Sequence, residues 1–332
     1  MALNGKVMVT GGAGYIGSHA VLALCDAGYD VVVVDNLVTG FAWAVDSRAT
    51  LVEANVADDI AVRAAIRDHN VRAIMHFAGS VVVPESVSDP LKYYRNNTAA
   101  TRSLIESAVT EGVPHFIFSS TAATYGTPVK VPVEETDPTV PINPYGMSKL
   151  MTEAMLRDVA AAHPINYCAL RYFNVAGADP QGRSGQSTVG ATHLIKIAVE
   201  AATGKRAAVS VFGTDFDTPD GTGVRDYIPV SDLAAAHVAA LELLIAEPTQ
   251  SHTLNAGYNR GFSVNEVLDA VDRVTNMTIE RRYEGRRAGD PAALVADNRA
   301  ILAALPWRPQ RDDLDTIVKD ALAWERKLSE RQ

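Results

Sequence analysis

A tyrosine and a lysine stand four positions apart in the segment PYGMSKLM, at Tyr145 and Lys149. Residues four apart lie on one face of an α-helix, so the phenol and the ammonium would reach the same small volume. An ammonium close to a phenol favours the phenolate and lowers the pKa of the tyrosine from about 10. The pair is therefore typical of a general acid and base, although the same spacing also occurs on ordinary exposed helices.

Asn143 and Pro144 place this pair at the beginning of a helix. Asparagine is a favoured N-cap residue, and proline is tolerated at the first helical position because its missing N–H would have no partner there. The sequence therefore predicts a helix that starts at Pro144.

A cluster of hydroxyl side chains ends the segment FIFSSTAATYG, residues 116–126. The apolar run before it predicts a buried strand, and doubly wound sheets bind ligands at the carboxyl ends of their strands. Each hydroxyl alone is better explained as a local backbone cap. Beside the tyrosine and lysine, the cluster offers a third group for catalysis.

The first forty residues carry a glycine pattern typical of dinucleotide binding. Gly12, Gly14 and Gly17 stand between a strand-like run and a helix-like segment, and Asp35 ends the next apolar run. Such glycines let the backbone approach a pyrophosphate, which the N-terminus of the helix receives. An acid at position 35 accepts hydrogen bonds from the ribose and repels a 2′-phosphate, so we expect NAD rather than NADP.

The elements that would hold these residues follow a strand and helix alternation. Six apolar runs read as strands, and five of them precede segments of helical length; they are KVMVTGG, DVVVVDN, ATLVEANV, RAIMHFAG, HFIFSST and INYCALRYFN. This alternation predicts an α/β fold with a doubly wound parallel (Rossmann) sheet. After about residue 175 the pattern loosens into Gly- and Asp-rich stretches. We expect an NAD-binding domain over residues 1–174 and a smaller mixed α/β substrate domain over 175–332, with some later segments returning to the first domain.

Composition excludes several functional classes. The chain has 332 residues, 47% apolar and 21% charged, with a net charge of -9 that argues against a nucleic-acid or anionic-membrane surface. No run of about 18 apolar residues and no N-terminal leader is seen, so we expect a cytoplasmic protein. Cys25 and Cys168 lie far apart in apolar segments and suggest neither a disulfide nor a metal site.

Taken in order, the motifs resemble the extended short-chain dehydrogenases/reductases and, within them, the UDP-glucose 4-epimerases. The resemblance covers nearly the whole chain and rests on TGGAGYIGSH, DN, HFAG, ESV, YYRNN, FSSTAATYG, PYGMSKLM, LRYFNVAGA, GTGVRDYI and RRAGDPAALVAD. It implies interconversion of UDP-glucose and UDP-galactose through a transient 4-keto sugar, with tightly bound NAD. By analogy it also implies a homodimer paired through the helices that begin near Pro90 and Pro144.

The resemblance further implies roles for individual residues. Tyr145 would be the catalytic acid and base, Lys149 would lower its pKa and bind the nicotinamide ribose, and Thr121 would take the place of the catalytic serine or threonine. Together with Tyr145 and Lys149, the cofactor positions would be Gly11, Gly14, Tyr15, Ile16, Gly17, Asp35, Asn36, Asn55, Val56, Phe77, Ala78, Gly79, Asn97, Ser119, Tyr172 and Phe173. The UDP-sugar positions would be Thr121, Tyr145, Asn174, His193, Leu194, Arg225, Arg287 and Asp290. Arginine suits the diphosphate because its fork pairs with phosphate oxygens, and an ion pair with Asp226 is the alternative for Arg225.

Five positions depart from the family's usual pattern. Asn55 stands where aspartate is usual, which makes a contact to adenine neutral, and Val81 and Pro84 replace residues near the cofactor. His193 stands where some members have asparagine, and Leu294 falls where side-chain size influences the fit of an N-acetyl group. UDP-pentoses (xylose/arabinose) and UDP-N-acetylhexosamines therefore stay open as substrates.

Two other functions share part of this pattern. A nucleotide-sugar 4,6-dehydratase needs further acid or base groups beside the threonine, where this chain has Ala122 and Ala123. A redox-sensing dinucleotide-binding regulator could lose Tyr145 or Lys149, and both are present. The pattern favours the epimerase over both.

Overall fold

One large parallel sheet forms the centre of the molecule in the computed structural model, which describes residues 3–287 and 290–330. Its seven strands lie in the order β10-β6-β5-β4-β1-β2-β3, and every neighbouring pair is parallel. They are β1 (Lys6–Thr10), β2 (Val31–Asp35), β3 (Thr50–Glu53), β4 (Val71–His76), β5 (His115–Thr121), β6 (Asn166–Tyr172) and β10 (His252–Ala256). The six strands expected from the apolar runs are therefore confirmed.

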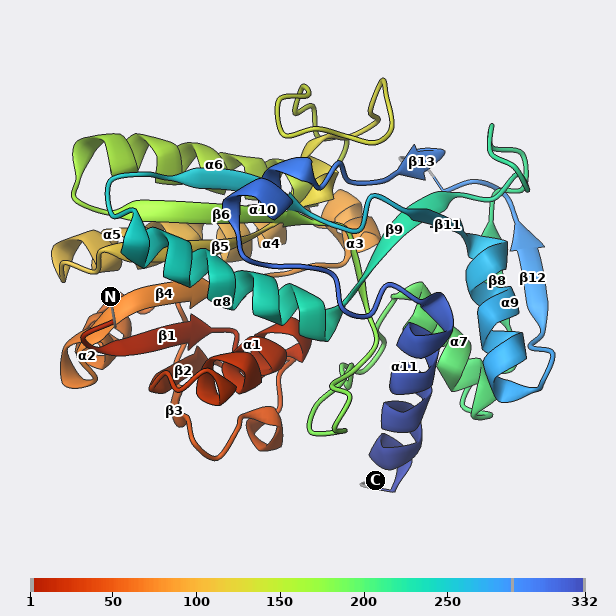
Figure 1. The fold of residues 1–332 in the computed structure, drawn as a ribbon, viewed down its shortest axis with the longest axis horizontal. Helices are drawn as coiled ribbons and strands as arrows, with labels where there is room; N and C mark the ends of the chain where they lie inside the picture. Colours follow the sequence, from red (N-terminus) through yellow and green to blue (C-terminus); the bar gives the residue numbers. More distant parts are fainter. Residues whose placement is uncertain (1–2, 288–289, 331–332) are drawn as a thin grey trace.

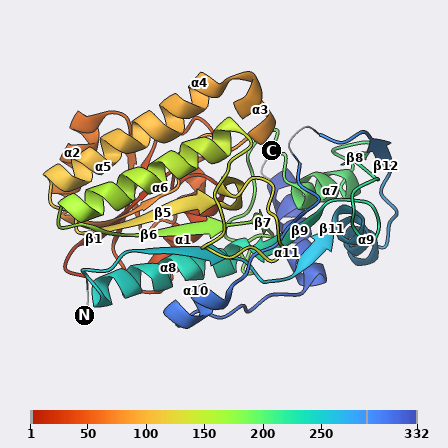
Figure 2. The same ribbon diagram turned by 90° about the horizontal axis from the view of Figure 1, so that it is seen from above.

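Helices cover both faces of this sheet, because strands that are apolar throughout must be buried on both sides. One apolar core lies between the sheet and α1 (Tyr15–Asp26), α8 (Val230–Ala246) and α10 (Arg299–Ala304). A second core lies between the other face and α2 (Asp59–Asp68), α5 (Ala100–Thr110) and α6 (Pro144–Ala162). Figures 1 and 2 show these two helical layers, which confirm the doubly wound α/β fold.

Short elements connect these layers at the carboxyl end of the sheet. They are the 3₁₀ turns η1 (Ala42–Ala44) and η3 (Ala122–Thr124), the helices α3 (Val83–Ser88) and α4 (Pro90–Tyr93), and the π-helical segment η2 (Tyr94–Ala99).

A smaller group of elements packs beside the carboxyl edge of the large sheet (Figure 1). Its four-stranded sheet contains β7 (Asn174–Ala176), β9 (Val224–Pro229), β11 (Gly261–Ser263) and β13 (Ala293–Leu294), and β8 (Val209–Phe212) pairs with β12 (Arg281–Glu284). A third apolar core joins α7 (Leu194–Ala202), α9 (Val264–Thr275) and α11 (Leu314–Ser329).

Three elements from the second half of the chain lie on the large sheet. α8 packs against α1, α10 packs against β10, and β10 pairs with β6 so that Ala256 stands opposite Tyr172. The domain boundary at residue 174, with later segments returning across it, stays a prediction. No helix in the described ranges combines the length and the apolar character that a bilayer span requires.

The first turn of α6 has the predicted signals. Pro144 is its first residue, and the Oδ1 of Asn143 accepts a hydrogen bond from the Gly146 backbone N–H at 2.9 Å. A Cβ at position 146 would lie 2.4 Å from the carbonyl oxygen of Ala123, so glycine lets α6 approach the end of β5 closely. The helix face toward the sheet is buried, and it carries Tyr145 and Lys149.

Candidate active site

The structure brings Thr121 and Tyr145 together at the carboxyl end of β5. Thr121 is the last residue of this strand, and its side chain hydrogen-bonds with the Tyr145 phenol from the first turn of α6. Burial raises the pKa of Tyr145, and the hydrogen bond with Thr121 lowers it by less. A phenol held in this way can exchange a proton with a ligand placed beside it.

Lys149 lies one turn further along α6 and is enclosed by the sheet. Its Nζ donates a hydrogen bond of 2.9 Å to the carbonyl oxygen of Ser119 and lies 5.0 Å from the centre of the Phe118 ring. Burial lowers its pKa to about 8. Within the described part of the chain the ammonium therefore contacts the backbone of β5, and a lowering of the Tyr145 pKa by Lys149 stays a prediction.

Tyr172 adds a second phenol to the cluster. It ends β6, and the pairing of β5 with β6 sets it opposite Thr121. Its hydroxyl hydrogen-bonds with Ser119 Oγ. Burial and then the neighbouring Tyr145 raise the pKa of Tyr172, which favours its neutral form.

The segment after β4 runs alongside this cluster. Asn97, in η2, accepts a hydrogen bond from Ser80 N at 2.7 Å and donates one to Ser148 Oγ at 3.0 Å. Gly79 has a φ of +158°, and a Cβ there would lie 2.9 Å from Asn97 Oδ1. Glycine therefore allows residues 77–79, which include Phe77 and Ala78, to pass between η2 and the loop after β1.

The loop between β1 and α1 is shaped by glycine. Gly11 has a φ of +72°, and a Cβ there would lie 2.6 Å from Ala78 N, while a Cβ at Gly17 would lie 2.1 Å from Gly11 O. Gly14 is the N-cap of α1 and has no side chain to satisfy the first turn. The first intrahelical bond runs from Ser18 N to Gly14 O, which leaves the N–H groups of residues 15–17, including Ile16, free to meet an anion.

Asp35 is held beside this loop at the end of β2. Its Oδ2 accepts a hydrogen bond from Ala13 N at 2.9 Å, and its Oδ1 accepts one from Leu37 N at 2.8 Å. Asn36 follows it and is exposed. Both carboxylate oxygens keep lone pairs that could accept hydrogen bonds from a ribose.

Asn55 and Val56 follow β3 on the same edge of the sheet. The Oδ1 of Asn55 accepts a hydrogen bond from Ala57 N at 2.9 Å, and the side chain is exposed, whereas Val56 is buried. The neutral amide at position 55 therefore completes a local turn and leaves its NH₂ for a ligand.

Arg225 and Asp290 meet at the opposite side of the site. The Arg225 guanidinium lies 3.8 Å from the Asp290 carboxylate. Burial lowers the pKa of Arg225. The Asp226 carboxylate instead accepts backbone N–H groups, from Tyr258 at 2.9 Å and Ala296 at 3.2 Å. The alternative ion pair of Arg225 with Asp226 is therefore wrong, because adjacent residues of a strand point to opposite faces.

The remaining residues of the sugar side lie on β7, β13 and the segment before β13. The Arg287 guanidinium lies 3.6 Å from the centre of the Phe212 ring. Leu294 stands opposite Arg225 in the pairing of β13 with β9 and packs in an apolar cluster that includes Phe173. Asn174 begins β7, directly after Phe173, and stands opposite Tyr227 in the pairing of β7 with β9.

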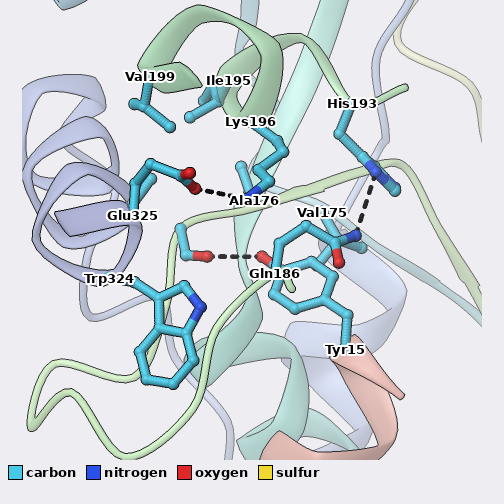
Figure 3. A pocket seen from close by; sticks show the side chains of 12 residues that line it. Tyr15, Val175, Ala176, Gln186, His193, Ile195, Lys196, Val199, Trp324 and Glu325 are labelled. Carbon is cyan, nitrogen blue, oxygen red and sulfur yellow. Dashed lines mark hydrogen bonds and ion pairs between the residues drawn. The ribbon is translucent and has the colours of Figure 1, made fainter. Parts of the chain in front are cut away.

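His193 and Leu194 lie at the start of α7, beside a cavity between α1, α7 and α11 (Figure 3). The rings of His193 and Tyr15 meet edge to face with centroids 6.2 Å apart, and burial lowers the pKa of His193. The residues that line this cavity do not include Thr121, Tyr145 or Lys149. His193 therefore meets Tyr15 at the N-terminus of α1, and the cavity that it lines is separate from the catalytic cluster.

Comparison with known proteins assigns the family. A model of the NAD dependent epimerase/dehydratase family matches residues 7–257. The chain belongs to this family.

Individual relatives in the family are similar over nearly their whole length. The UDP-glucose 4-epimerase of Azospirillum brasilense is 53% identical over 329 residues, which are 99% of this chain and 94% of that protein. The crystal structure of UDP-glucose 4-epimerase from Brucella ovis in complex with NAD has a TM-score of 0.93 at 43% identity and covers 96% of this chain and 98% of that one. The UDP-Glc/GlcNAc 4-epimerase from Campylobacter jejuni has a TM-score of 0.85 at 45% identity, with 98% and 100% covered.

The loop after β1 fits the NAD that the family requires. The uncapped first turn of α1 offers backbone donors for the pyrophosphate, and the glycines leave no Cβ between that anion and the backbone. Asp35 stands where the adenosine ribose would lie in this fold. NAD is thus the cofactor, and the residues at the carboxyl ends of β1, β2 and β4 are those that would hold it.

Two of the departures from the family pattern lie at the surface near α3. Val81 is 54% exposed, and Pro84 is the second residue of α3, where proline is tolerated. Their effect on cofactor binding stays a prediction.

A buried polar row beneath the catalytic cluster was not predicted. Ser120 donates a hydrogen bond to Glu153, Arg171 pairs with the Glu153 carboxylate at 2.6 Å, and Arg171 donates to the Tyr125 hydroxyl, which bonds Asn255 at 2.7 Å. The pairing of β5, β6 and β10 sets Ser120, Arg171 and Asn255 side by side. A polar residue near the carboxyl end of each of these three strands was the available signal.

Proposed function

We propose that this protein is a UDP-glucose 4-epimerase, which interconverts UDP-glucose and UDP-galactose by transient oxidation at C4 of the sugar. The hydrogen-bonded pair of Thr121 and Tyr145, at the ligand-binding edge of a sheet that also carries the NAD loop, is the observation that supports it. The 53% identity to a UDP-glucose 4-epimerase over 99% of this chain adds to this support.

Tyr145 takes the proton of the C4 hydroxyl in this proposal. When bound, NAD supplies the acceptor, and later the donor, of the hydrogen carried on C4 with its electron pair. Thr121 orients the phenol through its hydrogen bond, and Tyr172 stays neutral beside it. Because burial raises the pKa of Tyr145, a nearby positive charge is needed for proton transfer near neutral pH, and Lys149 is the group we assign to this task.

Inversion at C4 requires that the sugar present both faces of the ketone to the same side of the site. The protein must then bind the UDP end firmly and the hexose loosely, because binding energy from remote groups can hold the substrate throughout. Arg225 and Arg287 suit this task. Asp290 positions the Arg225 guanidinium and Phe212 positions that of Arg287, and both guanidinium groups keep N–H donors for the diphosphate.

UDP-N-acetylhexosamines are the second candidate substrates, followed by UDP-pentoses. The 45% identity to a UDP-Glc/GlcNAc 4-epimerase favours the acetylated sugars. Leu294 packs against the apolar cluster that includes Phe173, so its side chain contributes to the wall whose size we expect to limit the N-acetyl group.

A panel of UDP-sugars tests the proposal. The NAD-loaded protein is incubated separately with UDP-glucose, UDP-galactose, UDP-N-acetylglucosamine and UDP-xylose, and C4 epimers are quantified by proton NMR. We expect the first two to interconvert with the highest kcat/KM. Conversion of UDP-xylose or UDP-N-acetylglucosamine without conversion of UDP-glucose would replace the substrate assignment.

We further propose that the protein is a homodimer paired through α3, α4 and α6. Val87, Leu91 and Met151 expose 64%, 76% and 40% of their surface on these packed helices, which leaves an apolar face. Sedimentation should show a dimer for the wild type and a monomer for Leu91→Glu, and a monomeric wild type would contradict the proposal. The cytoplasmic location stays a prediction.

A further inference from the structure

A segment of the smaller part of the molecule crosses the N-terminus of α1. We call residues 177–188 the strap; it is the light green loop between α1 and α11 in Figure 1. Tyr15 hydroxyl donates to Gly177 O at 2.7 Å, the Ser18 and Ser184 hydroxyls lie 2.8 Å apart, and an ion pair of 2.8 Å joins the strap to the end of α1 at Asp26. The strap therefore lies over the helix end that receives the cofactor pyrophosphate.

Trp324 of α11 holds the other side of the strap. It is only 2% exposed, and its indole N–H donates to Ser187 Oγ at 3.1 Å. A Cβ at Gly185 would lie 2.2 Å from the Trp324 ring, so only glycine allows the strap to lie flat on the indole. Figure 3 shows Trp324, Gln186 and Tyr15 around one cavity, with the strap residue Gln186 between the helices.

A second loop approaches the glycine-rich loop from the cofactor side. Residues 39–44 follow Asp35, and Phe41 N donates to Ala13 O at 2.9 Å. A Cβ at Gly40 would lie 2.8 Å from the Ala13 carbonyl carbon, which shows how closely the two loops meet. This loop and the strap line one small pocket together with Gly14, at the N-cap of α1.

Three aromatic rings join the two covering segments. The Phe41 and Trp43 rings are stacked with centroids 5.1 Å apart, and the Trp43 and Trp324 rings are stacked with centroids 6.2 Å apart. Phe41 and Trp43 belong to loop 39–44, and Trp324 belongs to α11, which contacts the strap. They therefore connect the loop that follows β2 to the helix that packs against the strap.

We propose that Phe41, Trp43 and Trp324 form a latch that keeps bound NAD captive. Dissociation of the dinucleotide requires loop 39–44 and the strap to separate, and the stacked rings oppose that separation. The inference rests on the NAD dependence of the family and is independent of which sugar nucleotide is the substrate. It assigns to Trp43 a role in retaining the cofactor. A single catalytic turnover does not need this role.

Isotope exchange tests the latch. Protein loaded with radiolabelled NAD is mixed with excess unlabelled NAD, without any sugar nucleotide, and the label left on the protein is followed with time. Trp43→Ala removes both stacked pairs, so exchange should become at least about 10-fold faster, which corresponds to about 1.4 kcal/mol and lies within the usual worth of aromatic pairs. Trp43 is 44% exposed, so the variant should fold.

Two variants give the controls. Trp43→Phe keeps a stacked ring and should exchange like the wild type, whereas Val189→Ala removes an 87% exposed side chain just beyond the strap and should change nothing. Wild-type exchange rates in Trp43→Ala would overturn the latch, as would equally fast exchange in Val189→Ala. Because no substrate is present, these outcomes are separate from failure of the UDP-sugar panel.

Discussion

At the scale of the residue, the proton chemistry rests on one buried phenol. Tyr145 hydrogen-bonds with Thr121, and its pKa is raised by burial. Tyr145→Phe removes the proton acceptor and leaves the ring, so epimerisation should fall at least about 10²-fold, the usual scale for loss of a general base. The NAD content of the variant should be unchanged, and it is measured by denaturing the protein and quantifying the nucleotide that is released. Near-normal turnover in this variant would show that another group takes the proton.

Lys149 can be tested at the same scale through the pH dependence of kcat. Its ammonium bonds the Ser119 carbonyl, and it is the nearest assigned source of positive charge along the α6 face that carries Tyr145. Without that charge the pKa of Tyr145 should rise, so the acidic limb of the pH-rate profile of Lys149→Met should move to higher pH. A limb that does not move would assign the tuning of Tyr145 to another charge.

At the scale of the element, α6 is anchored by an ion pair one turn beyond Lys149. Glu153 and Arg171 each expose 8% of their side chains, and the pair joins α6 to β6. Glu153→Ala leaves the guanidinium buried with its main partner gone, which should reduce the free energy of unfolding by about 3–5 kcal/mol. Urea unfolding measures this loss.

Matched variants separate this anchor from a general effect of lost charge. Glu153→Gln keeps acceptors for Ser120 and Arg171 and should lose less stability than Glu153→Ala. Glu106 pairs with Arg102 on the exposed face of α5, and Glu106→Ala should change stability by less than about 1 kcal/mol. An equal loss for Glu106→Ala and Glu153→Ala would contradict the anchoring role.

At the scale of the whole molecule, buried histidines should limit stability in acid. Burial lowers the pKa of His19 and of His237 to about 4, and that of His76 to about 3, from an ordinary value of 6.5. Between pH 6.5 and the lowered pKa values of the folded state, the unfolded chain binds protons that the folded chain does not. The contribution of these histidines to the free energy of unfolding is therefore fully present above pH 6.5 and is lost as the pH falls. Three such sites give a loss of up to about 4 kcal/mol per pH unit.

Chemical denaturation across this pH range measures the slope. His76→Gln should flatten it by the share of one such site, at most about 1.4 kcal/mol per pH unit. His163 is exposed at the end of α6, and His163→Gln should leave the slope unchanged. A slope that is the same in the wild type and in His76→Gln would show that other groups cause the acid sensitivity.

The sequence by itself determined the large sheet, the NAD loop and the helix start at Pro144. These features depend on local patterns, namely apolar runs, glycine spacing and capping residues, which act within a few positions of the chain. Only the tertiary structure decided that Arg225 pairs with Asp290 rather than Asp226, that Lys149 bonds the Ser119 carbonyl, and that Trp43 stacks on Trp324. Each of these contacts depends on the packing of segments distant in sequence, and the side-chain directions that packing sets are not encoded by spacing along the chain.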